Sequence, residues 1–437
     1  MARKRVITGI DIGSSKTVTI IVSIDDEDQL SVIGVAHAES RGVRKGNIVD
    51  IEEATSTVVS SLEAAERMAG YQVESAFVSV GGTHISSQNT HGVVAVADPS
   101  AEITESDVER VIEAAQAISL ASARKIIHVL PRYFTVDSQE GIKDPVGMSG
   151  VRLEVDTHLV TGGVTSLKNL EKCLANVGID TAGFVFGGLA SAESVLTETE
   201  KELGVVLMDI GSGTTDIAIY VEGALSCSSV LPVGARNVTN DIAIGLRISL
   251  ESAEKLKRFM GTEPRKVVHP HEEDEEQTKK RHRRYEDDDD IDISRLDLTE
   301  GMKTVSRRTL VDGIIRPRLN ELFSMVVDEI KRSGFAGVIP AGLVITGGGA
   351  KTVGLSDAAR RTVALPHRLG SPQDIKGVSD EVESGAYAAA MGIVRYGSKV
   401  ETKVAPSVWS NLPKFFKNQP IKSSASRVVD LVKSLLP

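Results

Sequence analysis

The feature that most constrains this chain is a short motif that occurs twice. The sequence Asp-Ile-Gly-Ser-x-x-Thr stands at residues 11–17 and again at residues 209–215, each time between two apolar runs. This pattern predicts a β-hairpin whose glycine turn directs backbone N–H groups into one concavity, where a phosphate can bind. Asp11 and Asp209 end the first strand of each hairpin, where a carboxylate can hold Mg²⁺ through water. One copy alone fits a buried strand with a glycine turn equally well, but two copies favour a nucleotide held between related halves.

Length and composition set the limits of the protein class. The chain has 437 residues, of which 41% are hydrophobic, so it can form more than one domain with a buried core. Its net charge of −10 argues against a nucleic-acid partner. With Cys173 and Cys227 as the only cysteines, we expect no disulfide framework and a reducing cytoplasm. Asp11 interrupts the apolar run after the basic start, so we expect no secretory signal, and no apolar stretch is long enough to predict a membrane-spanning helix.

The periodicity of the first half predicts strands, one helix and an insertion. Asp50 is the expected N-cap of the helix and Gly70 the residue that follows its end. Residues 83–162 do not continue this pattern of elements and predict an inserted α/β subdomain. The expected elements are strands at Val6–Ile10, Thr17–Ser23, Leu30–Ala36 and Val73–Val80, a helix at Ile51–Ala69, and within the insertion a helix at Thr104–Ala117 and strands at Val129–Val136 and Val151–Val160.

The rest of the chain predicts a second α/β half. A long amphipathic helix is expected over Arg307–Lys331, with an interruption near Pro317. The other expected elements are helices at Leu167–Asn176, Ala190–Lys201, Thr239–Ile244, Ser249–Met260, Leu355–Val363 and Glu383–Gly392, and strands at Gly183–Gly187, Ala224–Pro232 and Leu343–Thr346.

A block of alternating acids and bases interrupts this half at residues 262–295. Such a run buries too little apolar surface to order itself, so we predict a disordered, solvated loop, with a regulatory or partner-binding loop as the alternative. His269, His271 and His282 lie in it without the spacing of metal ligands, so we predict no metal site there.

A third glycine-rich element, Gly347–Ala350, follows the strand at Leu343–Thr346. Alone it fits a tight turn between a strand and a helix. In a chain that also carries both hairpins, its bare backbone is better explained as a surface that a flat ligand approaches closely.

Three such elements in this order resemble the ATPase superfamily of actin, sugar kinases and heat-shock chaperones. The resemblance implies ATP as ligand, with the two hairpins as phosphate loops, Gly347–Ala350 as the adenosine motif, and Asp11 and Asp209 as acids that hold Mg²⁺ through water. Glu254 and Lys257 match a Glu-x-x-Lys helix beside the ribose and adenine, although an ordinary solvated pair is the alternative. The implied ATP-binding residues are Ser14, Ser15, Lys16, Gly211, Ser212, Gly213, Thr214, Thr215, Glu254, Lys257, Gly347, Gly348, Gly349 and Ala350.

Within the superfamily, the place of the insertion is similar to that in the FtsA family of bacterial cell-division proteins. Only a short connection separates Ala36 from Ile51, whereas the insertion follows Val80. The runs Gly141–Gly150 and Gly188–Thr197 also resemble this family. The resemblance covers roughly residues 5–397, and the charged 262–295 segment departs from it by being longer and more polar.

We therefore expect an α/β protein of two actin-like, ribonuclease-H-like halves, with mixed sheets around a nucleotide cleft and a smaller subdomain on each half. The expected division is a first half over residues 1–82, 163–202 and 379–397, its inserted subdomain over 83–162, a second half over 203–235 and 312–378, its smaller subdomain over 236–311, a flexible linker over 398–424, and an amphipathic helix over 425–437.

The C-terminal residues predict a helix that lies in a membrane interface. Its apolar side chains share one face and a basic linker precedes it, which favours binding to anionic lipids. A terminal helix docked on the protein's own core is the alternative. Five aliphatic side chains supply only about 5–8 kcal/mol before ordering costs, so we expect one copy to bind weakly and a filament to gain avidity. The membrane-facing residues are Val428, Leu431, Val432, Leu435 and Leu436.

The resemblance implies a protein that polymerises, tethers the FtsZ ring to the cytoplasmic face of the inner membrane at the division site, and recruits later division proteins. It places the FtsZ C-terminal tail on the smaller subdomain of the second half, where Arg307 and Arg308 are candidate contacts and ordinary surface charge is the alternative. The resemblance also implies tight ATP binding with weak hydrolysis at best. The residues themselves offer no distinct catalytic base, since the possible bases Asp209 and Asp216 both have structural explanations. A sugar or other small-molecule kinase of the same fold is the alternative function.

Overall fold

The computed structural model describes residues 5–25, 27–97, 102–262, 289–373, 376–377 and 380–403. Residues up to Ser398 belong to one compact unit, and a second unit begins at Lys399. The predicted membrane helix at 425–437, most of the charged segment at 262–295 and most of the linker lie outside the described residues.

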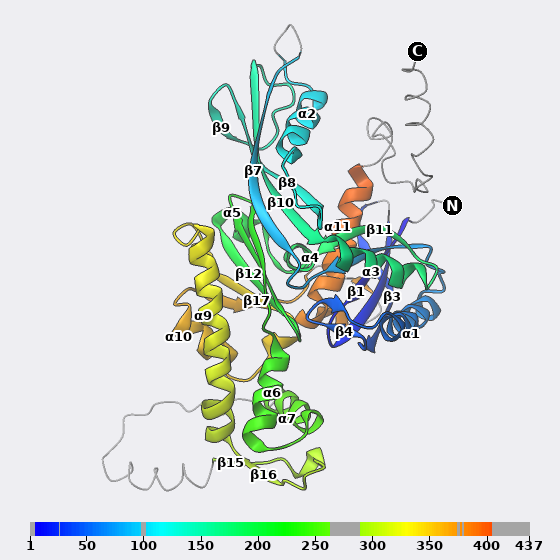
Figure 1. The fold of residues 1–437 in the computed structure, drawn as a ribbon, viewed down its shortest axis with the longest axis vertical. Coiled ribbons are helices and arrows are strands. Elements are labelled where there is room, and N and C mark those ends of the chain that lie inside the picture. The colour runs from blue at the N-terminus through cyan, green and yellow to red at the C-terminus, as the bar shows by residue number, and fades with distance from the viewer. Residues whose placement is uncertain are drawn as a thin grey trace, which may run out of the picture. The chain divides into compact units, whose positions relative to one another are not determined.

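The first half is built on a six-stranded mixed sheet in the order β11-β6-β1-β2-β3-β19 (Figure 1). The antiparallel meander β1-β2-β3 forms one side, and β6 joins β1 in parallel. Their bounds are β1 Arg5–Ile12, β2 Lys16–Ile24, β3 Leu30–Glu39, β6 Ser75–Val80, β11 Asp180–Phe186 and β19 Lys376–Gly377.

Helix α1, Ile51–Ala69, packs on this sheet and begins and ends as predicted. The Asp50 side chain accepts a hydrogen bond from the Glu53 N–H at 3.0 Å, which caps the first turn. Gly70 ends the helix in the left-handed conformation at φ 61°. Its buried face carries Ala54, Val58, Leu62 and Ala65.

The second half repeats this design in a five-stranded sheet, β14-β13-β12-β17-β18. Here β12-β13-β14 is the antiparallel meander and β17 joins β12 in parallel. The shared topology confirms the expected α/β fold with two related halves. The bounds are β12 Val205–Ile210, β13 Thr215–Val221, β14 Ala224–Leu231, β17 Leu343–Thr346 and β18 His367–Leu369.

Residues 83–162, named here the insert, form mainly a third sheet in the order β7-β10-β8-β9, with one helix packed on it. Thr104 and Asp107 cap this helix reciprocally, and Arg110 pairs with Asp107. Neither β7 nor the short β9 was predicted from the sequence. Periodicity missed β7 because its sequence SSQNTHGVVA is polar over its first half. The bounds are β7 Ser86–Ala95, α2 Glu105–Gln116, β8 Arg124–Val136, β9 Gln139–Ile142 and β10 Arg152–Gly163.

A helical region with a small hairpin extends the second half. The interruption expected near Pro317 is present, since the π-helical segment η2 passes into α9 with Pro317 in the first turn of α9. The bounds are α6 Ala235–Leu246, α7 Leu250–Thr262, β15 Asp290–Asp292, η1 Ser294–Leu296, β16 Thr304–Ser306, η2 Arg308–Ile315, α9 Arg316–Ser333 and α10 Leu355–Thr362.

Some helix predictions were wrong in their bounds. The helix expected over Thr239–Ile244 is longer and spans Ala235–Leu246. The helix expected over Ala190–Lys201 is two helices, α4 Gly187–Val195 and α5 Glu198–Leu203, because Thr197 starts a new helix by a capping box with Glu200. The helix expected over Glu383–Gly392 starts later. Short turns at Asp380–Glu383 and Gly385–Tyr387 precede α11, Ala388–Lys403, which runs past the expected start of the linker at 398.

Three short elements complete the first half. Helix α3 spans Val164–Ala175, and the hairpin β4–β5 pairs Val43–Arg44 with Asn47–Ile48. In the part of the chain that the structure describes, no helix combines the length and apolar character needed to cross a membrane.

Replacing Gly392 by alanine tests the packing of α11 on α4. A Cβ on Gly392 would lie 1.6 Å from the carbonyl oxygen of Ala190, so the two helices would have to separate. We expect Gly392→Ala to lower the free energy of unfolding by about 3 kcal/mol, measured by denaturant unfolding followed by circular dichroism. The matched control is Gly313→Ala on an exposed helical site, whose Cβ would meet its nearest atom at 3.9 Å. Equal stabilities of the two variants would contradict this packing.

Candidate functional site

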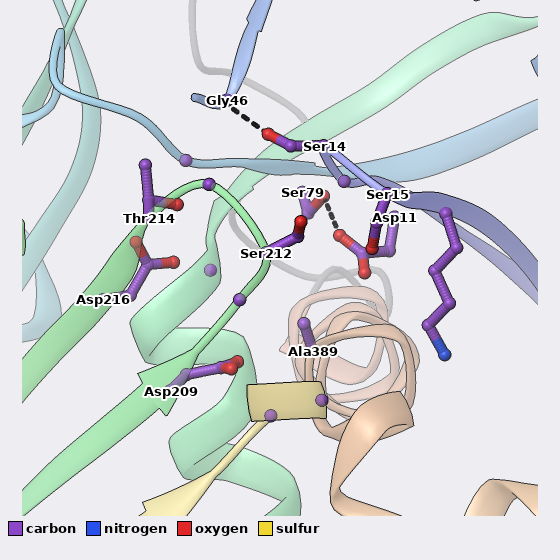
Figure 2. A pocket seen from close by; sticks show the side chains of 18 of the residues that line it. Asp11, Ser14, Ser15, Gly46, Ser79, Asp209, Ser212, Thr214, Asp216 and Ala389 are labelled. Carbon is purple, nitrogen blue, oxygen red and sulfur yellow. Dashed lines mark hydrogen bonds between the residues drawn. The ribbon is translucent and has the colours of Figure 1, made fainter. Parts of the chain in front are cut away.

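The turns of the two repeated hairpins face each other across one pocket (Figure 2). The β1–β2 turn comes from the first half and the β12–β13 turn from the second half. The residues that line the pocket are Asp11, Ile12, Gly13, Ser14, Ser15, Lys16, Gly46, Ser79, Gly81, Gly187, Asp209, Gly211, Ser212, Gly213, Thr214, Asp216, Gly347, Gly348, Gly385, Ala386 and Ala389.

The first hairpin holds Asp11 at the end of β1. The Ser79 hydroxyl donates to Asp11 Oδ1 at 2.6 Å and accepts the Ile12 N–H at 3.3 Å, which ties β6 to the turn. The Gly13 N–H closes the turn on the Lys16 carbonyl oxygen at 3.1 Å. Burial raises the pKa of Asp11, against the opposing effects of the Ser79 hydrogen bond and of Lys16.

The second hairpin holds Asp209 in the corresponding place. The Ser191 hydroxyl on α4 donates to Asp209 Oδ2, and the Gly211 N–H closes the turn on the Thr214 carbonyl oxygen at 2.9 Å. Burial raises the pKa of Asp209 to about 6, with Ser191 lowering it and the Asp11 charge raising it.

Asp216, the second residue of β13, adds a third carboxylate to the pocket. Burial raises its pKa well above the usual range, and the charges of Asp209 and Asp11 raise it further. Among the described residues, Asp216 Oδ1 is buried without a hydrogen-bond partner. Such an atom in a polar pocket is free to bond to a water or to a ligand.

Lys16 supplies positive charge to the same pocket. Its Nζ lies 3.5 Å from the centroid of the Tyr387 ring, a cation–π distance. Burial lowers the pKa of Lys16 to about 8, although the Asp11 charge opposes this change. The Tyr387 hydroxyl in turn donates to Glu381 and shares a hydrogen bond with His37 at 3.0 Å.

The three acids fit a cation that takes most of its ligands from water or a phosphate. In the described ranges, no group of three or more His, Cys, Asp or Glu side chains is placed to bind a metal ion directly. Gly347 leaves room beside Asp209, since its φ is 89° and a Cβ there would lie 2.2 Å from Asp209 Oδ1. Acids that repel one another beside glycine turns favour a bound phosphate with its counter-ion.

Several predicted ATP contacts do not line the pocket. Thr215 is fully buried and donates to the Val233 carbonyl oxygen at 2.8 Å, so its hydroxyl holds the hairpin to the next loop. Gly349 packs on Ile210. Ala350 packs against the apolar core of the second half. The remaining predicted phosphate-loop and adenosine-loop residues, Ser14, Ser15, Lys16, Gly211, Ser212, Gly213, Thr214, Gly347 and Gly348, lie in the pocket wall together with Asp11 and Asp209.

Glu254 and Lys257 lie on α7, behind the adenosine-motif turn. Lys257 Nζ is 2.6 Å from Glu254 Oε2 and 2.8 Å from the Thr239 hydroxyl, and the residue is only 9% exposed. The pair is therefore not the ordinary solvated pair that the sequence left open. A Cβ on Gly261 would lie 2.5 Å from the Lys351 carbonyl oxygen, so the end of α7 packs against the adenosine-motif turn.

Sequence reasoning missed the wall residues that come from single strand ends. Ser79 lies near the end of β6 and Gly81 follows it. Because β6 runs parallel to β1, the carboxyl ends of the two strands meet at the edge of the sheet where Asp11 lies. The dipeptide Gly81-Gly82 after a strand was the available signal. No sequence motif indicated the other wall residues, Gly46, Gly187, Gly385, Ala386 and Ala389.

Arg307 and Arg308 lie outside this pocket, at the start of η2. Their backbone N–H groups donate to Asp289, from Arg307 to its carbonyl oxygen at 2.7 Å and from Arg308 to its side chain at 2.8 Å. Arg308 is exposed and Arg307 is partly buried. The predicted membrane-facing residues lie outside the described part of the chain.

Family models match two stretches of the chain. The model described as "SHS2 domain inserted in FTSA" matches residues 82–161, which correspond to the insert, and the model "Cell division protein FtsA" matches residues 206–392.

Full-length relatives give the same result. The cell division protein FtsA of Pseudomonas aeruginosa is 39% identical over 90% of this chain and 89% of its own length. FtsA of Escherichia coli is 33% identical over 93% of this chain and 96% of its own length.

Solved structures of lower identity share the fold. A PilM–PilN type IV pilus biogenesis complex matches with a TM-score of 0.61 and 15% identity over 90% of this chain and 98% of its own. MreB5 of Spiroplasma citri bound to AMPPNP matches with a TM-score of 0.51 and 13% identity over 92% of this chain and 98% of its own. These matches confirm the expected actin-like fold.

The pKa of Asp209 predicts a pH dependence of stability that Asp209→Asn removes. Because the folded state raises this pKa to about 6, the protonated acid stabilises the fold at low pH and this contribution is lost as pH rises through 6. Between pH 5 and pH 7 the unliganded protein should lose about 1 kcal/mol of unfolding free energy relative to Asp209→Asn. Denaturant unfolding at several pH values measures the difference. Parallel pH curves for the two proteins would contradict the assignment.

Proposed function

Since the chain belongs to the FtsA family of cell division proteins, we propose that it is an ATP-binding, actin-like protein that polymerises and tethers the FtsZ ring to the membrane. In this proposal it acts at the cytoplasmic face of the inner membrane, at the septum, and recruits later division proteins to the divisome. The observation that carries the proposal is the pairing of two phosphate hairpins, one from each half, over a single pocket.

ATP is the proposed ligand of this pocket. The backbone of the two turns, with the hydroxyls of Ser14, Ser15, Ser212 and Thr214, supplies the hydrogen-bond donors that phosphates require. Gly347 and Gly348 give the nucleoside a bare surface. Spiroplasma MreB5, which shares the fold and was solved with AMPPNP bound, supports a nucleotide as the ligand.

Mg²⁺ is the proposed counter-ion, held through water by Asp11 and Asp209. A bound Mg²⁺ would neutralise phosphate charge and oppose the mutual repulsion of the buried acids. Ser79 and Ser191 orient the two carboxylates by donating to one oxygen of each, which leaves the other oxygen of each side chain for a water ligand.

The nucleotide is proposed to act mainly as an assembly ligand. The two hairpins belong to different halves, so a ligand that contacts both stabilises one arrangement of the halves. Asp216 is the nearest candidate for activating water, but its raised pKa reflects burial beside two other acids. We therefore propose weak hydrolysis at most, and filament formation through head-to-tail contacts between copies.

Membrane attachment is assigned to the C-terminal residues 425–437. Their amphipathic pattern and the basic linker before them support binding to anionic lipids. A filament that presents many such helices would bind with avidity that a single short helix lacks. The alternative of a sugar kinase has no specific observation in its favour.

The proposal is tested by co-pelleting the protein with FtsZ on lipid vesicles, with and without ATP. We expect FtsZ to sediment with vesicles only when this protein is present, and more strongly with ATP. Sedimentation of FtsZ that does not depend on this protein would overturn the tether.

Removing residues 426–437 should abolish binding to anionic vesicles while ATP binding stays intact, because the predicted apolar face and the nucleotide pocket share no residue. Vesicle flotation and calorimetric titration with Mg-ATP measure the two properties. A control truncation that keeps this segment but shortens the linker should still float. Unchanged flotation without residues 426–437 would contradict the predicted membrane helix.

Reversing the charge of Arg307 and Arg308 should weaken binding of the FtsZ C-terminal tail by about tenfold or more, because an acidic peptide then meets like charge. Fluorescence anisotropy with a labelled tail peptide measures the affinity. The control is the same reversal at Arg360 and Arg361 on α10, which should leave the affinity unchanged. Equal losses in both pairs would indicate general electrostatics rather than a specific contact.

A further inference from the structure

The small hairpin β4–β5 turns back on itself at Lys45 and Gly46. Val43 pairs with Ile48 and Arg44 with Asn47, so these two residues form the whole turn. Both have positive φ, 48° for Lys45 and 74° for Gly46. This is the tight two-residue turn that matches the twist of a β-hairpin. We name residues 45–46 the tip.

The tip lies against backbone on both sides of the nucleotide pocket. A Cβ on Gly46 would be 2.7 Å from the carbonyl group of Gly81 and from Gly82 Cα, in the first half. A Cβ on Gly213 would be 3.1 Å from Lys45 Cα and 2.9 Å from Ser14 Oγ, which brings in the second half. The tip, the Gly81-Gly82 turn and the β12–β13 turn therefore meet closely, with little room for a side chain between their backbones.

A hydrogen bond joins the tip to the first phosphate hairpin. The Gly46 N–H donates to Ser14 Oγ at 3.1 Å, and Figure 2 shows this bond beside the turn that carries Ser212 and Thr214. Because the Ser14 oxygen accepts from Gly46, its own hydrogen is directed to another acceptor. In a pocket lined by Ser14 and Gly46, a phosphate oxygen is such an acceptor.

We propose that the tip is a third element of the phosphate end of the nucleotide site. Gly46 positions the Ser14 hydroxyl as a donor to the phosphates, and the backbone of Lys45 is the surface on which Gly213 of the second half closes. This inference rests on the proposed nucleotide-binding function.

Nucleotide binding and docking of the tip then stabilise each other. Both require the same approach of Gly213 to Ser14, so each makes the other more favourable by the same free energy. The Lys45 side chain itself is exposed and does not line the pocket, so the contact is made by backbone. A tip that only completes a turn would show no such coupling.

The test compares Gly46→Ala with Gly70→Ala. Both glycines have positive φ, 74° and 61°, so both alanines carry similar backbone strain. A Cβ on Gly70 meets no atom within 4 Å, whereas a Cβ on Gly46 meets the Gly81 and Gly82 backbone. The difference between the variants therefore isolates the docking of the tip.

Stopped-flow release of a fluorescent ATP analogue with Mg²⁺ gives the first readout. We expect release from Gly46→Ala to be about tenfold faster than from Gly70→Ala, because the positioned hydroxyl and the closed contact are both lost. We expect Gly70→Ala to match the unaltered chain. Should Gly46→Ala fail to fold, Gly213→Ala wedges the same contact from the second half and should also release the analogue faster.

Trypsin cleavage after Arg44 and Lys45 gives the second readout, since both side chains are exposed. Bound nucleotide should slow this cleavage in the unaltered chain and in Gly70→Ala, but not in Gly46→Ala. Equal release rates from the two variants, or cleavage that nucleotide does not slow, would overturn the inference alone. Failure of the unaltered chain to bind the analogue would overturn the proposed nucleotide function and the inference with it.

Discussion

Three carboxylates, Asp11, Asp209 and Asp216, share one pocket, and they come from both halves of the chain. Burial raises the pKa of each, and the acids raise one another's pKa values further at Asp209 and Asp216. Repulsion between the ionised acids is relieved by protonation or by a cation, and a cation with few protein ligands can bind an anion such as phosphate beside it. The glycine turns that surround the acids provide N–H groups for that anion. The fold of each half serves to present one hairpin and one acid to this common point.

Hydrogen bonds join the insert to strand β14 of the second half. Ser87 on β7 donates to the Ser228 carbonyl oxygen on β14 at 2.7 Å, and His158 bridges Asn89 and the Ser228 hydroxyl at 2.6 and 2.8 Å. Burial lowers the pKa of His158 to about 4, so the ring is neutral at physiological pH and both contacts are ordinary hydrogen bonds. The insert is covalently part of the first half but hydrogen-bonds to the second. Any change in the angle between the halves would have to shift or break these hydrogen bonds.

The sequence predicted what local periodicity and repetition encode. The duplicated hairpins, helix α1 with its caps at Asp50 and Gly70, and the pocket residues Asp11 and Asp209 could be predicted because each lies within one short stretch. Elements whose place depends on contacts between strands far apart in the sequence could not be predicted. Strand β7 is too polar to be recognised from its periodicity, and Ser79 joins the site only because β6 lies beside β1. The break between α4 and α5 was missed because a capping box overrides a continuous apolar pattern. The contacts of the tip depend on backbone approach, which leaves no pattern in side chains beyond isolated glycines.

The central claim is that both hairpins hold one nucleotide and its cation together. Calorimetric titration of Mg-ATP into the full chain, compared with Asp11→Asn and Asp209→Asn, tests this most directly. We predict one site per chain, an affinity that falls when Mg²⁺ is withheld, and similar losses of about tenfold or more in both variants, since each removes one charged ligand of the same ion. Binding that ignores Mg²⁺, or that is weakened by one substitution and unaffected by the other, would contradict it.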